Sequence, residues 1–138
     1  MEIKNVEECL KFRLLRKIAP NKEKSEKSLE IAKNRLKDAE FILSLNRIFN
    51  HVIIDSYNAM FHASRALLYR DGIQEKSHFA VYVYIREKYA SRIPSNVINF
   101  LNIHRIERHE TVYGTDYEPS KSDAELALKD AKEFFREI

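Results

Sequence analysis

The stretch SYNAMFHASRALL, residues 56–68, decides how this chain is expected to fold. Apolar and small residues recur in it every three or four positions, which is the spacing of one face of an α-helix. Two stripes run side by side through it and its flank: Ile53, Tyr57, Met60, Ser64 and Leu67, and beside them Ile54, Phe61 and Leu68. Such a wide face is typical of the central helix of a bundle. We therefore predict a helix from about residue 50 to residue 70 that stops at Asp71-Gly72.

The composition favours an all-α domain. The chain has 138 residues, of which 44% are hydrophobic and 33% charged, and this length fits a single domain over residues 1–138. With only 2 glycines and 3 prolines, few turns are available, which favours long helices over many short strands. The formal net charge of +3 permits an acidic ligand such as a nucleotide or RNA without requiring one.

Cys9 is the single cysteine, so the sequence excludes an intrachain disulfide and a cysteine-rich metal site. A free thiol fits a reducing cytoplasm, and no apolar run approaches the roughly 18 residues that span a membrane. The N-terminal residues are interrupted by charges, unlike a signal peptide. No metal-binding or phosphate-loop motif is present. We therefore expect a cytoplasmic protein with no metal, no cofactor and no membrane partner.

Hydrophobic spacing predicts five further helices. Their expected ranges are about 2–18, 23–45, 77–90, 94–110 and 123–137. The expected N-caps are Asn21 or Ser25 for the second helix of the chain and Ser77 for the fourth, with a capping box over 122–125 for the last. The segment HFAVYVYI, residues 78–85, could pass for a strand, but no second strand-like segment is available to pair with it. Short connections predict an up-and-down antiparallel helical bundle with additional short helices.

The predicted helix 94–110 carries a line of residues that begins apolar and ends basic. Val97, Leu101, His104 and Arg108 are spaced by four, three and four positions, so they share one face, with Arg105 and His109 alongside. Arg108 could grip a phosphate with its planar guanidinium, and His109 could carry a proton near neutral pH. The alternative is that Arg108 pairs with Glu107, Glu110 or Asp116 and merely caps the helix.

A second polar line follows the central helix at Asp55, Asn58, His62 and Arg65. We interpret Asp55 and His62 as the solvent edge of this helix. Asn58 and Arg65 lie between apolar positions, so they are better candidates for contact with another helix or subunit. Asn58, Arg65 and His104 are therefore secondary candidates for a binding site.

Residues from about Ser28 to Ile138 resemble the HEPN domain family, and more closely its branch of small stand-alone proteins. The resemblance rests on the helix leading into SYNAMFHASRALL, then Gly72 and Lys76-Ser77-His78. It continues in the arginine cluster that ends at Tyr113 and in the pattern ALxxAxxF at residues 127–134. It implies a helical bundle that commonly dimerises.

Many members of that family cleave RNA without a metal. They use an arginine, an adjacent polar residue and a histidine about four to six residues beyond the arginine, and two copies meet across a dimer. Here Arg108 matches the arginine, His109 matches the polar residue, and Tyr113 stands where the histidine is expected. A phenol ordinarily titrates at about pH 10, so it is a poor general base at neutral pH. The resemblance therefore favours binding over cleavage.

The leading hypothesis is a nucleotide- or RNA-binding module with little or no catalytic activity. Its cleft would be lined by Arg105, Arg108, His109 and Tyr113, and the resemblance implies a homodimer and a small nucleotidyltransferase as partner. One alternative is a metal-independent RNase toxin of a toxin–antitoxin pair, which would use Arg108 and His109. The other is a protein-interaction module without a nucleic-acid ligand.

Overall fold

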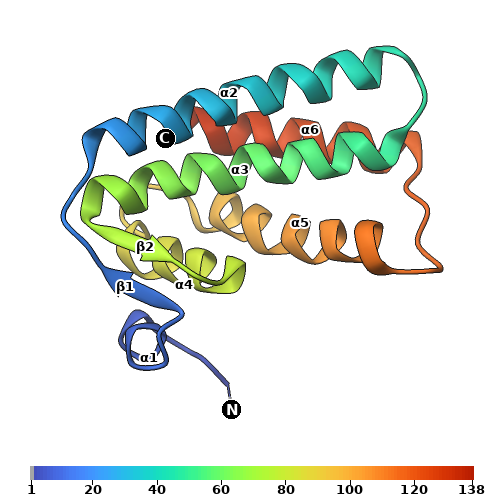
Figure 1. The fold of residues 1–138 in the computed structure, drawn as a ribbon. Coiled ribbons are helices and arrows are strands. Elements are labelled where there is room, and N and C mark those ends of the chain that lie inside the picture. Colours follow the sequence, from blue (N-terminus) through green and yellow to red (C-terminus); the bar gives the residue numbers. More distant parts are fainter. Residues whose placement is uncertain (1) are drawn as a thin grey trace.

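The computed structural model describes residues 2–138, and these residues form six helices with a two-stranded sheet at one end of the bundle (Figure 1). The helices are α1 (Val6–Lys11), α2 (Lys22–Ser44), α3 (Phe49–Asp71), α4 (His78–Lys88), α5 (Ser95–Tyr113) and α6 (Lys121–Arg136). The strands are β1 (Leu15–Lys17) and β2 (Ile73–Glu75). The predicted antiparallel helical bundle is confirmed, and the small sheet was not predicted.

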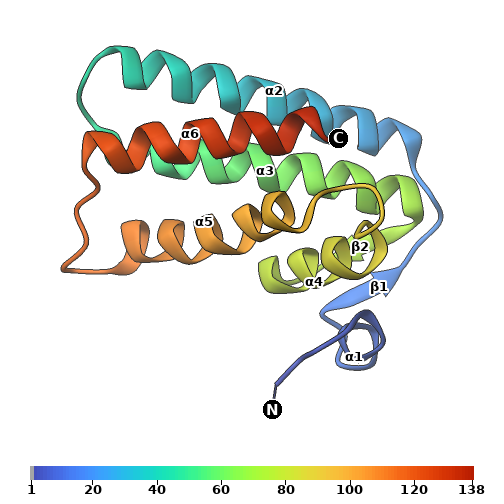
Figure 2. The same cartoon turned by 180° about the vertical axis from the view of Figure 1, so that it is seen from behind.

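Helix α3 is the central helix, as its sequence predicts. It contacts α2, α4, α5, α6 and β2, and Figures 1 and 2 show α2 and α6 along one side of it and α4 and α5 along the other. Its two predicted stripes are buried, except that Ile54 is half-buried. The helix ends at Gly72, whose φ of 81° is the left-handed conformation that a glycine adopts without steric strain.

The helix starts follow the expected capping chemistry with one exception. The Asn21 side chain accepts a hydrogen bond from the Lys24 N–H, and Ser77 does the same for Ala80. The segment 78–85 is helical, as predicted. The predicted capping box of α6 is wrong by two residues, because Ser120 and Asp123 cap each other reciprocally in place of residues 122 and 125.

The predicted helix over residues 2–18 is wrong. Helix α1 ends at Lys11, and Arg13 turns the chain with a positive φ of 59°. Strand β1 then pairs antiparallel with β2, so that Leu15 lies opposite Glu75. The Lys76 N–H also donates to the Leu14 carbonyl. Apolar spacing in a short segment does not reveal a partner strand that comes more than fifty residues later, and this non-local pairing decides its structure.

Helix α5 is longer than predicted, because it continues to Tyr113. Arg105, Arg108, His109 and Tyr113 therefore all lie on one rigid helix. Among residues 2–138, no helix is both long enough and apolar enough to cross a membrane.

Candidate functional site

Arg105 is held in place by its own helix and by α4. Its Nε and Nη2 both donate to the Asn102 side-chain oxygen, at 3.0 and 2.9 Å. Its guanidinium carbon lies 5.2 Å from the centre of the Phe79 ring, in the range of a cation–π contact. Both partners are uncharged, so the positive charge of Arg105 is not neutralised by them.

Arg108 lies half-buried one turn further along α5. Its Nε is shielded from solvent and has no hydrogen-bond partner within the described part of the chain. No carboxylate of residues 2–138 lies at ion-pair distance from it. Glu107 is occupied elsewhere, because its two oxygens accept from His104 and Tyr117. The alternative in which Arg108 pairs with a nearby carboxylate is therefore wrong.

Arg105 and Arg108 lie close enough to a hydrogen-bonded pair of side chains from α3 and α4 to affect their pKa values. The Tyr57 hydroxyl lies 2.8 Å from Nδ1 of His78, and the His78 ring stacks on Phe61 with ring centres 4.1 Å apart. Burial raises the pKa of Tyr57, and burial together with Arg108 and Arg105 lowers the pKa of His78. The phenol is therefore protonated and the imidazole is neutral, and the two share this hydrogen bond. These uncharged side chains thus lie beside two guanidinium groups that their own contacts do not neutralise.

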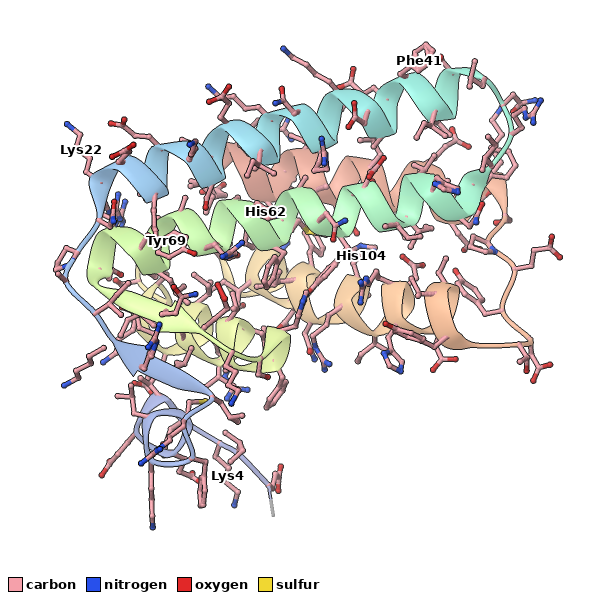
Figure 3. All side chains as sticks on the ribbon, in the orientation of Figure 1. Lys4, Lys22, Phe41, His62, Tyr69 and His104 are labelled. Carbon is pink, nitrogen blue, oxygen red and sulfur yellow. The ribbon has the colours of Figure 1, made fainter. Side chains whose placement is uncertain are left out.

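Arg65 and His62, which is labelled in Figure 3, lie further along α3. His62 is half-buried, and within residues 2–138 its shielded Nδ1 has no hydrogen-bond partner. Burial together with Arg65 and Arg35 lowers its pKa to about 4, so this side chain is uncharged at neutral pH. Asp55 is half-buried as well, so the interpretation of these two residues as the solvent edge is wrong. Arg65 contacts a strand and not the predicted helix or subunit, because its Nε lies 2.6 Å from Glu75 of β2.

We name the surface made of His62, Arg65, His78, Arg105 and Arg108 the α3–α5 cationic face, after its three arginines, because its two histidines are uncharged at neutral pH. Asn58 lies half-buried on α3, one turn before His62. Arg65 is paired with Glu75, whereas the two arginines of α5 have no acidic partner in residues 2–138. Sequence spacing predicts the two arginines but not His78 or Tyr57, which come from other helices.

His109 and Tyr113 lie at the C-terminal end of α5. Their rings contact each other with centres 4.9 Å apart, and Tyr113 is 67% exposed. His109 is exposed too. The structure therefore divides the four predicted residues into half-buried arginines near His78 and an exposed His109–Tyr113 pair.

His104 belongs to the core, which corrects its prediction as a secondary ligand candidate. It is only 1% exposed, and Figure 3 shows it between α3 and α5. Its Nδ1 and Nε2 lie 2.8 Å from Glu107 and Asp130, respectively. Burial acts to lower its pKa, but the two carboxylates outweigh burial and the pKa is raised. A ligand has no access to this side chain.

Asp130 is the partner that sequence analysis missed. It lies on α6 three residues after Ala127 and four before Phe134, so it shares the buried stripe of that helix. A carboxylate on an otherwise apolar stripe was the available signal, because a buried charge requires a partner.

The comparisons with known proteins agree with this architecture. The HEPN domain family matches residues 25–138, a span that contains nearly all of α2 and the whole of α3 to α6. The search of the curated proteins found no significant match. The match covers most of the chain and every residue of the α3–α5 cationic face, and this chain therefore belongs to the HEPN domain family.

Proposed function

We propose that this HEPN domain binds a nucleotide or RNA through the α3–α5 cationic face, with little or no catalytic activity. The observation that carries the proposal is the Nε of Arg108, which is shielded from water and has no hydrogen-bond partner among residues 2–138. Leaving a buried donor unpaired costs about 1–3 kcal/mol. A phosphate oxygen accepts from a guanidinium in the geometry that this side chain offers.

The surroundings of Arg108 support an anionic ligand. Arg105 adds a second positive charge that its neutral partners Asn102 and Phe79 orient without neutralising. The neutral Tyr57–His78 pair and Phe61 add uncharged side chains beside both arginines. A phosphate bound at Arg105 and Arg108 would therefore meet two cations that have no carboxylate at ion-pair distance within residues 2–138.

Replacing Arg108 by alanine is expected to weaken binding of labelled RNA and of ATP about tenfold or more. A hydrogen bond to a charged group contributes about 1.5–3 kcal/mol, and a tenfold change corresponds to about 1.4 kcal/mol. Fluorescence anisotropy titrations of the wild type and the Arg108→Ala variant measure the effect.

The matched control is Arg136→Ala, which removes the same charge from the exposed end of α6. It is expected to bind like the wild type. Equal binding by wild type and Arg108→Ala would contradict the proposed site. A folded Arg108→Ala and a folded wild type that both bind no ligand would favour the protein-interaction alternative.

The exposed His109–Tyr113 pair bears on the RNase alternative. We propose that it contacts the ligand without cleaving it, because Tyr113 occupies the position of the expected histidine. RNA incubated with the protein in EDTA is then expected to stay intact. Cleavage that persists in EDTA and disappears in His109→Ala would show the RNase activity instead.

We also propose a homodimer formed through the outer face of α5. Ile103 and Ile106 are 55% and 50% exposed, and they border a groove of about 430 Å³. Large apolar side chains that gather on one exposed helix face are typical of an interface. Pairing of two copies there would place both His109–Tyr113 pairs on one assembly.

The substitution Ile106→Glu is expected to convert this dimer into a monomer, because a charge would be buried in the apolar interface. Sedimentation velocity measures the change. The control is Leu126→Glu, which alters an equally exposed apolar side chain on α6. An unchanged sedimentation coefficient in Ile106→Glu would contradict this interface.

The remaining partner implied by the family resemblance is a small nucleotidyltransferase. We propose it as the binding partner of the chain in the small stand-alone branch of the family. Coexpression of such an enzyme with the tagged chain, followed by affinity capture, tests the pairing.

A further inference from the structure

A basic cleft lies beside the two-stranded sheet, outside the α3–α5 cationic face. It has a volume of about 750 Å³ and is bounded by the end of α1, by β1 and by β2. Four of its lining residues are cationic: Arg13, Arg16, Lys17 and Lys76. The first three precede the span that matches the HEPN family, so membership in the family does not account for them.

The positive charge of this cleft is not neutralised. Glu75 is the acidic residue of its wall, and Arg65 of α3 already holds its Oε1 at 2.6 Å. In the described range 2–138, none of the four cations has a carboxylate at ion-pair distance. A concave surface with one sign of charge attracts ligands of the opposite sign.

The cations of the cleft are carried by ordered backbone. The pairing of β1 with β2 fixes Arg16 and Lys17, and the Lys76 N–H donates to the Leu14 carbonyl at 2.9 Å. Arg13 holds a left-handed conformation with φ of 59°, which costs a residue other than glycine about 1–2 kcal/mol. The fold therefore fixes the backbone of these four residues, so that binding has to order only their side chains.

The cleft adjoins the α3–α5 cationic face through Glu75, which pairs with Arg65. Lys76 lines the cleft, and two residues later His78 stacks on Phe61. Arg65 connects the two surfaces, because it pairs with Glu75 of the cleft wall and lies 5.7 Å from the Phe61 ring centre. In both views of the fold, β2 and α4 lie between α1 and α5 (Figures 1 and 2).

A ligand with a single phosphate group can occupy either the basic cleft or the α3–α5 cationic face, but not both. A chain of repeating phosphates can occupy both surfaces at once, because each phosphodiester carries one negative charge. We infer that the cleft formed by Arg13, Arg16, Lys17 and Lys76 binds the backbone of a single-stranded polynucleotide whose other part occupies the α3–α5 cationic face. This inference rests on the proposed function and extends it by naming the ligand class.

The test compares a long and a short ligand. The probes are labelled oligouridylates of about 12 and about 3 nucleotides, of which the first lies within and the second below the usual site sizes of about 4–16 nucleotides for single strands. The double variant Arg16→Ala/Lys17→Ala is expected to weaken binding of the long probe about tenfold. Loss of two phosphate contacts, each contributing about 0.7, is expected to reduce the slope of log affinity against log salt by about 1.4. Binding of the short probe is expected to stay unchanged.

The matched control is Lys33→Ala/Lys37→Ala, which removes the same charge from the exposed face of α2. Equal weakening of the long probe by the control and the cleft variant would overturn the inference. So would a cleft variant that binds the long probe like wild type while Arg108→Ala does not, and that outcome would leave the proposed function intact. If wild type binds neither probe, the inference fails, and the ATP titration then decides whether the proposed function fails with it. If inorganic polyphosphate displaces the long probe at equal phosphate concentration, the cleft selects phosphate chains and not polynucleotides.

Discussion

The substitution Asp130→Ala is expected to lower the free energy of unfolding by about 3–5 kcal/mol. Removing one member of a buried ion pair leaves the other charge without compensation, and such changes have this magnitude. Both His104 and Asp130 are buried, and the 2.8 Å contact between them joins α5 to α6. Chemical denaturation followed by circular dichroism measures the loss. A loss below about 1 kcal/mol would contradict this role for the pair.

The variant Asp130→Asn provides the control, because an amide oxygen keeps the hydrogen bond and removes the charge. Folding raises the pKa of His104 above its ordinary value of 6.5 through Glu107 and Asp130. The stabilisation by the charged pair is therefore complete below about pH 6.5 and is lost as the pH rises through the folded pKa. The difference in stability between wild type and Asp130→Asn should shrink over that range. Below about pH 6.5, His62 and His78 have the opposite effect on the free energy of unfolding. Folding lowers their pKa values, so their protonation destabilises the folded state.

The substitution Gly72→Ala is expected to destabilise the fold by about 2–4 kcal/mol, from left-handed strain and from overpacking. Gly72 has a φ of 81°, and an added Cβ would lie 2.7 Å from the carbonyl oxygen of Ile18. That oxygen belongs to backbone that the Ile18–Gly72 hydrogen bond holds in place. Thermal unfolding and chemical denaturation measure the loss.

The converse substitution, Asn46→Gly, serves as the control. Asn46 has a positive φ of 55° between α2 and α3, a conformation that glycine adopts without steric strain. The free energy of unfolding of Asn46→Gly is expected to stay within about 1 kcal/mol of the wild-type value. If Gly72→Ala is no less stable than Asn46→Gly, the close approach at Gly72 does not constrain the fold.

Local sequence patterns were sufficient for the long helices. The two stripes of α3 required nothing beyond their own spacing, and Ser77 identified the start of α4 even though its apolar residues resemble a strand. The failure over residues 2–18 has a different origin. Leu14 and Ile18 continue a helical spacing, but backbone pairing with residues 73–75 decides the conformation there.

The same distinction between local pattern and non-local packing applies to the candidate site. Arg105 and Arg108 could be placed together because one helix carries both. Their neighbours Tyr57 and His78 come from α3 and α4, and only the packing of three helices brings them near. His104 shares a face with Arg108 in the sequence, yet Asp130 of α6 removes it from the ligand surface.

The residues that fold together extend beyond the span that matches the HEPN family. Val6, Cys9 and Leu15 belong to the main core cluster, although all three precede residue 25, where the family match begins. A fragment trimmed to that boundary would lose the neighbour strand of β2 and leave apolar surface of the bundle open to water. Recombinant work on isolated HEPN segments of this type should therefore keep the leading two dozen residues as part of the cooperative folding unit.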